Sequence, residues 1–131
     1  SRHNAVYWRS GDWVGVGPGA HGRLTTETGR VAIECERQPA KYIEQVTNTG
    51  RGWSVSEPLS ALDQARERVS MGLRMTSGIP VGDLADLGFS LDGDAIAELT
   101  GQGLITTADG RVALTIAGRL AADRVAAMIS P

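Results

Sequence analysis

Hydrophobic side chains recur at helical spacing throughout the second half of the chain. The clearest stripe consists of Leu62, Ala65, Val69 and Leu73. It predicts a helix over residues 61–75 that begins after Ser60, a residue type that caps helices. Similar spacing predicts helices over residues 81–87 and 92–100, and a last helix over residues 115–129 with Thr115 as its cap.

Between the last two of these helices the pattern becomes strand-like. Residues 104–107 and 111–114 flank an Asp109-Gly110 dipeptide. Asp-Gly between two apolar runs is a strong signal for a β-hairpin with a two-residue turn. Three helices, a hairpin and a helix follow the order of a winged-helix-like domain, which we predict for this part of the chain.

The first part of the chain has short apolar runs in place of helical stripes. Residues 5–8 and 13–16 predict two short strands on either side of a turn at residues 10–12, and residues 31–35 predict a further strand. The run at 13–16 is apolar at consecutive positions, as in a strand covered on both faces. Pro39 suits the first position of a helix over residues 39–47.

A domain boundary is predicted near residue 57. The glycine-rich stretch from Thr49 to Ser54, which ends near Pro58, is typical of a linker. Residues 1–57 carry seven basic and six acidic groups and all three tryptophans, whereas residues 58–131 carry six basic and nine acidic groups. We therefore expect an α+β chain with two domains, 1–57 and 58–131.

Composition narrows the classes of function. A chain of 131 residues with 41% hydrophobic content and a net charge of −2 is expected to fold around a core. The single cysteine, Cys35, excludes an internal disulfide and a four-cysteine zinc site. No apolar stretch approaches the ~20 residues that cross a bilayer, so nothing indicates membrane association. Without a signal-peptide layout we expect a cytoplasmic protein, and a start without Met suggests a piece of a longer chain.

Nucleic-acid binding is not expected, although the winged-helix order invites it. The helix that would enter a DNA groove, residues 92–100, carries three acidic residues and no basic one. The hairpin tip adds only Arg111 beside Asp109. Lys and Arg supply most of the affinity for duplex DNA. A packing or protein-interaction role is therefore the default for residues 58–131.

The loop at residues 17–22 matches the glycine spacing of a dinucleotide-binding loop. That function needs a helix to begin at the last glycines, and residues 23–29 are β-branched and turn-rich. Two interpretations remain open. Gly17 and Gly19 permit unusual backbone angles, or the loop's N–H groups bind a carboxylate or phosphate beside Arg23.

Each histidine has a functional and a structural interpretation. An offset of four places His3 beside Tyr7, and Asn4 beside Trp8, on one face of either a helix or a strand. An imidazole backed by an aromatic ring suits an axial haem ligand, whereas the alternative is a hydrogen-bonded histidine near core aromatics. His21 is either a proton-transfer group or a hydrogen-bonded loop histidine.

Cys35 is expected to be unreactive and to take no part in a metal site. It lies between Glu34 and Glu36, which disfavour the thiolate. His3, His21 and Cys35 come from three distant segments, and nothing in their spacing predicts that they converge on a metal.

Four segments together resemble the radical S-adenosylmethionine coproporphyrinogen III oxidase-like family. They are HNAVYW at 3–8, GDWVGVGPGAHGRL at 11–24, LSALDQARERVSMGLRMTSGI at 59–79 and GLITTADGRVALTIAGRLAADRV at 103–125. The first pair is the more specific and is most similar to the haem chaperone (HemW) branch. The resemblance covers the whole chain and corresponds to the family's C-terminal third. It implies that residues 1–57 end an α/β barrel and residues 58–131 form the C-terminal domain.

The resemblance makes His3 the leading candidate for haem contact and for ligation of haem iron. It places Asn4, Tyr7 and Trp8 around that histidine. It places the loop of Gly17, Gly19 and His21 at the mouth of a barrel, where ligands bind. We add, as an inference from chemistry alone, that Arg23 lies near a propionate, since a guanidinium pairs with a carboxylate through two hydrogen bonds.

The family's three cluster cysteines, spaced C-x₃-C-x₂-C, are not in this sequence. The parent protein is thus expected to bind [4Fe–4S] and S-adenosylmethionine upstream, and this segment to be catalytically inert. The first hypothesis is a haem- or porphyrin-binding segment of a haem chaperone, with a haem-accepting protein as partner. The alternatives are the same region of a true coproporphyrinogen oxidase, or an interaction module unrelated to haem.

Overall fold

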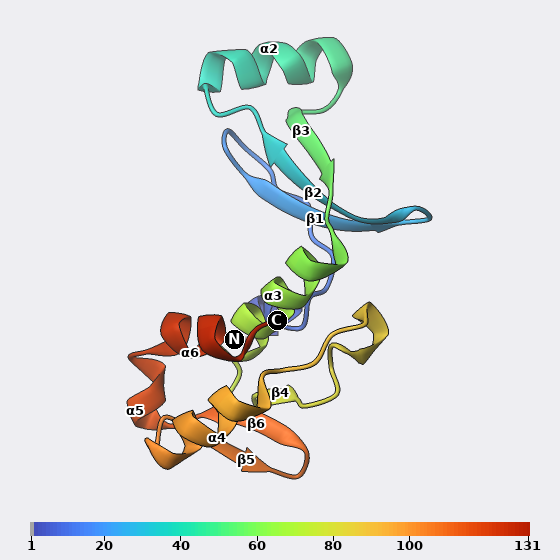
Figure 1. The fold of residues 1–131 in the computed structure, drawn as a ribbon. Coiled ribbons are helices and arrows are strands. Elements are labelled where there is room, and N and C mark those ends of the chain that lie inside the picture. The colour runs from blue at the N-terminus through green and yellow to red at the C-terminus, as the bar shows by residue number, and fades with distance from the viewer. Residues whose placement is uncertain (1) are drawn as a thin grey trace. The chain divides into compact units, whose positions relative to one another are not determined.

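The computed structural model describes residues 2–131, which form two compact units (Figure 1). One unit joins the described residues up to Ser10 to Ser60–Pro131, and the other consists of Gly11–Leu59. Each unit has a three-stranded sheet of its own. The α+β class predicted from the sequence is confirmed, and the domain boundary near residue 57 stays a prediction.

The Gly11–Leu59 unit is an antiparallel sheet with one helix. Its strands are β1 (His21–Thr26), β2 (Gly29–Cys35) and β3 (Trp53–Pro58), in the order β1-β2-β3. Helix α2 (Pro39–Thr49) connects β2 to β3 and begins at the expected proline. Neighbouring strands of an α/β barrel run parallel. The antiparallel pairing therefore does not itself show a barrel, and the barrel origin of this part stays a prediction.

Two predictions for this unit were wrong. Residues 13–16 make only one bridge, Trp13 to Arg23, and Val14 and Val16 are exposed. The run lacks a continuous partner strand, so its apolar pattern alone does not make it a strand. The predicted linker is wrong from Trp53 onward, where β3 begins. Pairing with β2 supplies hydrogen-bond partners for the backbone of residues 53–58.

The other unit consists mainly of helices around a small sheet. Its elements are α1 (Arg2–Trp8), α3 (Ala61–Gly72), β4 (Ile79–Pro80), the 3₁₀ turn η1 (Ala85–Leu87), α4 (Gly93–Gly101), β5 (Ile105–Ala108), β6 (Arg111–Leu114), α5 (Ile116–Arg119) and α6 (Ala122–Ile129). Its strands are ordered β4-β6-β5. The side chains of Ser60, Asp92 and Thr115 each accept a hydrogen bond from a first-turn backbone N–H of the helix that follows.

The predicted hairpin is confirmed. Strands β5 and β6 pair antiparallel from Ile105 opposite Leu114 to Ala108 opposite Arg111. Asp109 and Gly110 have φ angles of 52° and 70°. Two successive positive φ angles are what a type I′ turn requires, and Asp-Gly adopts them at low cost.

Residues 5–8 are helical, so the strand predicted there was wrong. They belong to α1, which packs against α3 within the same unit. Four consecutive residues fit either an apolar strand or one helical turn, and the contact with α3 decides between them.

Two helix predictions in this unit also need correction. The helix predicted over residues 81–87 shrinks to the single turn η1, because the N–H of Val81 bonds to the carbonyl of Gly110 in the hairpin. The last helix is two helices, α5 and α6, with Ala121 outside helical geometry at φ −113° and ψ 20°. The winged-helix assignment stays a prediction.

The main hydrophobic core lies in the unit that contains α3 to α6. Its fully buried members are Ala65, Val69, Leu99, Val112, Val125 and Ile129. The Gly11–Leu59 unit buries only Ile33 and Cys35 among its hydrophobic side chains. Among the described residues, no helix is long and apolar enough to span a membrane.

We expect Leu99→Ala to lower the free energy of unfolding by about 2–5 kcal/mol, since Leu99 is fully buried and the change leaves a cavity. The matched control is Leu120→Ala, whose side chain is 96% exposed, and we expect it to change the same quantity by less than about 0.5 kcal/mol. Urea unfolding of both variants measures this. Equal effects would contradict the position of the core.

Candidate functional site

The N-terminal helix brings together the four residues expected around a haem. His3 and Tyr7 are one turn apart on α1, with ring centroids 5.1 Å apart at an interplanar angle of 73°. The Tyr7 hydroxyl lies 3.2 Å from Nε2 of His3. Asn4 and Trp8 occupy the adjacent positions, and His3 and Asn4 are exposed while Tyr7 and Trp8 are half-buried.

The contacts of His3 favour one tautomer. Nδ1 lies 3.4 Å from Oδ1 of Asn4, an oxygen that only accepts. These two contacts are compatible with a neutral ring that carries its proton on Nδ1 and accepts the Tyr7 hydroxyl at Nε2. An exposed imidazole whose neighbours orient the ring fits the chemistry of an iron ligand once the Tyr7 hydroxyl leaves Nε2.

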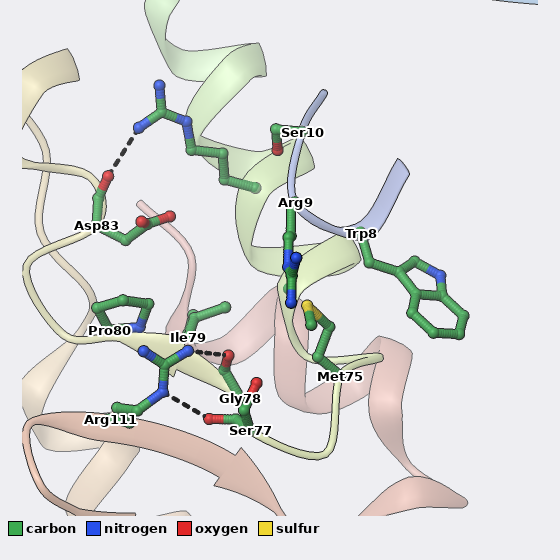
Figure 2. Close-up of a pocket in the computed structure, with 12 residues that line it drawn as sticks. Trp8, Arg9, Ser10, Met75, Ser77, Gly78, Ile79, Pro80, Asp83 and Arg111 are labelled. Carbon is green, nitrogen blue, oxygen red and sulfur yellow. Dashed lines mark hydrogen bonds between the residues drawn. The ribbon is translucent and has the colours of Figure 1, made fainter. Parts of the chain in front are cut away.

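A cleft of about 370 Å³ lies beside the end of α1, within the same unit (Figure 2). Trp8, Arg9 and Ser10 line it from the N-terminal segment, and Arg68 and Arg111 line it from α3 and β6. Arg9 and Arg68 are not among the site residues that the sequence predicts. The available signal was the position of Arg9, directly after the HNAVYW segment.

Two of the cleft arginines are held in place by the protein. Arg111 donates from Nε to the carbonyl of Ser77 at 2.7 Å and from Nη2 to that of Gly78 at 2.8 Å. Arg68 donates to both carboxylate oxygens of Asp86, at 2.7 and 3.0 Å. This ion pair lowers the pKa of Asp86 and keeps its carboxylate charged. Asp86 thus neutralises the positive charge of Arg68, whereas the hydrogen-bond partners of Arg111 are uncharged carbonyls.

The glycine loop lies in the other unit, and its backbone donors are used internally. The N–H of Gly17 donates to the Tyr42 hydroxyl at 3.1 Å, and that of Gly19 donates to the carbonyl of Glu36 at 2.9 Å. Both glycines have positive φ angles, 106° and 71°. The structure accounts for these two glycines without a ligand, and a ligand-binding role for them stays a prediction.

Two guanidinium groups lie near the ring of Trp13 in this unit. Those of Arg23 and Arg30 are 5.7 and 5.9 Å from its ring centroid. Arg23 also donates to the carbonyl of Gly22. Cation–π contacts of this kind are typically worth about 0.5–1 kcal/mol at exposed sites. Arg23 therefore has a structural role, and its proximity to a propionate stays a prediction.

His21 and Cys35 are part of the sheet. His21 is exposed on β1 opposite Glu34, and it helps Arg37 to lower the pKa of that carboxyl, with Arg37 making the larger contribution. Cys35 is buried, with its thiol 3.6 Å from the carbonyl of Gly15. In the described part of the chain, no group of three His, Cys, Asp or Glu side chains is arranged to hold a metal.

Residues 59–121 match the family model described as the HemN C-terminal domain. The expected resemblance to coproporphyrinogen oxidase-like radical SAM proteins is thereby confirmed over their C-terminal portion.

The proteins that this chain is similar to include ones named heme chaperone HemW. The chain is 32% identical to the heme chaperone HemW of Bacillus subtilis, with 95% of this chain and 33% of that protein covered. HemW of Mycobacterium tuberculosis strain H37Rv is 36% identical, with 95% and 30% covered. A radical S-adenosyl methionine domain-containing protein 1, mitochondrial, from Danio rerio is 42% identical, with 60% and 19% covered. The chain thus spans about a fifth to a third of the length of these relatives.

A solved structure shares the fold. Coproporphyrinogen III oxidase (HemN) from Escherichia coli, a radical SAM enzyme, matches with a TM-score of 0.65 over 90% of this chain and 28% of that chain. The sequence identity is 19%, so this likeness shows the fold alone.

Asp12 anchors the segment before the glycine loop, and its removal is expected to weaken the Gly11–Leu59 unit. It accepts from the Thr25 N–H at 2.8 Å, the Thr25 hydroxyl at 2.9 Å and Arg30 at 3.1 Å. These bonds, led by the Thr25 backbone, lower the pKa of Asp12. Because the folded pKa is depressed, the stabilisation is present above the ordinary carboxyl value and is lost as pH falls through the folded value.

We therefore expect Asp12→Asn to lower the melting temperature of β1 and β2 at about pH 7, and the difference from the native chain to shrink by about pH 3. Thermal melting followed by the NMR signals of these strands measures it. Glu27→Gln, which removes an exposed carboxylate from the β1–β2 turn, is the matched control. A difference that persists in acid would contradict the assignment.

Proposed function

We propose that this chain is the tetrapyrrole-binding C-terminal segment of a haem chaperone, with His3 as the ligand of haem iron. The observation that carries the proposal is the exposed His3 ring, oriented by Asn4 and Tyr7. The similarity to proteins named heme chaperone HemW supports it.

The residues around His3 would prepare it for iron. Asn4 would keep the proton on Nδ1, which leaves Nε2 as the coordinating atom. Bound haem supplies an iron that accepts a neutral imidazole nitrogen. The Tyr7 hydroxyl occupies Nε2 in this structure and has to turn away when iron takes its place, while the tyrosine ring continues to flank the imidazole.

The cofactors of the full-length protein belong to the same proposal. The radical SAM relatives imply a [4Fe–4S] cluster and S-adenosylmethionine in the parent. Cys35 is the single cysteine of this sequence, so those cofactors would be bound outside residues 1–131. A haem-accepting protein as partner and a cytoplasmic location remain predictions.

The second candidate is the corresponding region of a true coproporphyrinogen III oxidase. The fold shared with HemN of Escherichia coli is the observation in its favour. The two functions differ in outcome: the complete protein of an oxidase would restore decarboxylase activity to a strain that lacks it, and a chaperone would not.

A haem titration of the native chain and of His3→Ala tests the iron ligand. We expect a saturable shift of the Soret band with the native chain and loss of at least about 90% of it in the variant, because the ligating nitrogen is gone. The comparison variant is His21→Ala, which removes the other histidine; loss of the shift in His21→Ala but not in His3→Ala would assign ligation to His21 instead. Equal binding by all three proteins would contradict ligation by His3.

Tyr7→Phe tests the orientation of the ring. The variant keeps the aromatic contact and removes the hydroxyl that competes for Nε2, so we expect haem to bind about 2- to 10-fold more tightly. The same Soret titration gives the dissociation constant. Weaker binding by Tyr7→Phe would show that the hydroxyl supports iron ligation and does not compete with it.

A further inference from the structure

The arginine cleft beside α1 has a positive charge that the protein does not neutralise. Three arginines line it, and Asp86 pairs with one of them, Arg68. Arg111 bonds to two neutral carbonyls, and three of its five N–H donors remain for other partners. Figure 2 shows the Arg9 side chain extending away from the end of α1, and Arg111 bonded to Ser77 and Gly78.

One acidic side chain also lines this cleft. Asp83 contributes its backbone carbonyl to Arg68 at 2.8 Å, which holds that segment in place. Its carboxylate offsets one of the two remaining positive charges. Among the described residues, Arg9 and Arg111 form no ion pair with a carboxylate, and the local surplus is one positive charge. A surplus of positive charge in a concave site favours the binding of an anion, above all of a carboxylate that two guanidinium groups can share.

A second, more apolar hollow adjoins the arginine cleft. It has a volume of about 410 Å³ and is lined by Leu73, Leu114 and Ala122 together with two further arginines, Arg74 and Arg119, among others. Trp8 and Met75 line both hollows, so they form the boundary between the two. A flat apolar ligand with acidic groups at its edge matches this combination, because its ring contacts Trp8 and Met75 while its acids reach the arginines.

We infer that Arg9 and Arg111 bind the propionate carboxylates of a tetrapyrrole in this cleft, with the ring against Trp8 and Met75. The inference rests on the proposed tetrapyrrole-binding function and adds a site for the acidic edge of the ligand. It is independent of iron, since neither arginine coordinates a metal. It also assigns propionate recognition to residues other than Arg23, which lies in the Gly11–Leu59 unit.

The experiment uses a metal-free porphyrin, so that ligation by His3 plays no part. Deuteroporphyrin IX and its dimethyl ester, in the same dilute detergent, are titrated into the 131-residue chain and followed by porphyrin fluorescence. We expect saturable binding of the free acid and at least about tenfold weaker binding of the ester, because esterification removes both charges.

Single substitutions then locate the acid site. Arg9→Gln is expected to weaken binding of the free acid about tenfold and to leave binding of the ester unchanged. Asp83→Asn is expected to tighten binding of the free acid, since it removes the opposing carboxylate. Arg124→Gln, which removes an exposed arginine outside the cleft, is the matched control. Arg111→Gln serves as a second variant, with its melting temperature measured because Arg111 also holds residues 77 and 78.

The outcomes separate this inference from the proposed function. If the ester binds as tightly as the acid, or Arg9→Gln matches Arg124→Gln, the propionate site is wrong while haem ligation by His3 stands. Haem binding without binding of the metal-free porphyrin overturns the propionate site in the same way. If neither haem nor porphyrin binds, both the proposed function and this site are overturned.

Discussion

The unit that contains α3 to α6 depends on two close approaches between backbone segments. A Cβ at Gly118 would lie 1.8 Å from the carbonyl oxygen of Leu104, and one at Gly78 would lie 1.9 Å from that of Val112. Only glycine permits these distances. Gly118 lets α5 approach the residue before β5, and Gly78 lets the segment before β4 approach β6. The position of β6 then fixes Arg111 beside the carbonyls of residues 77 and 78.

The candidate chemistry of this unit follows from that arrangement and from a short helix. Helix α1 packs on α3, and its spacing of four residues places Tyr7 beside His3. Arg9 follows directly after the helix and enters the cleft that Arg111 lines from the hairpin. The proposed iron ligand, His3, and the proposed acid-binding cleft thus lie at the two ends of one seven-residue helix, and neither proposal needs a residue from the glycine loop.

The Gly11–Leu59 unit uses the same residue types for a different purpose. Its glycines accommodate turns whose N–H groups bond to Tyr42 and Glu36, and its arginines lie near Trp13. An anion-binding site also needs a glycine-rich loop and nearby arginines, so the two kinds of segment look alike in sequence. Hydrogen-bond partners distinguish the two cases, and they come from residues about 17 to 25 positions away.

The sequence by itself determined the elements whose causes are local. Ser60, Asp92 and Thr115 cap helices through their own side chains, and Asp109-Gly110 closes the hairpin through its backbone angles. The four-residue offset that pairs His3 with Tyr7 holds for a helix and a strand alike. That pairing was therefore predictable even though the secondary structure of residues 5–8 was not.

Only the tertiary structure decided the features that depend on distant partners. Residues 5–8 are helical because they pack against α3, and residues 53–58 form a strand because β2 lies beside them. The last helix divides at Ala121, whose backbone leaves helical geometry. The arginine cleft joins residues 9, 68 and 111, and no spacing along the chain indicates that these three side chains meet. Periodicity reports which face of a segment is apolar, whereas long-range packing selects what that face contacts.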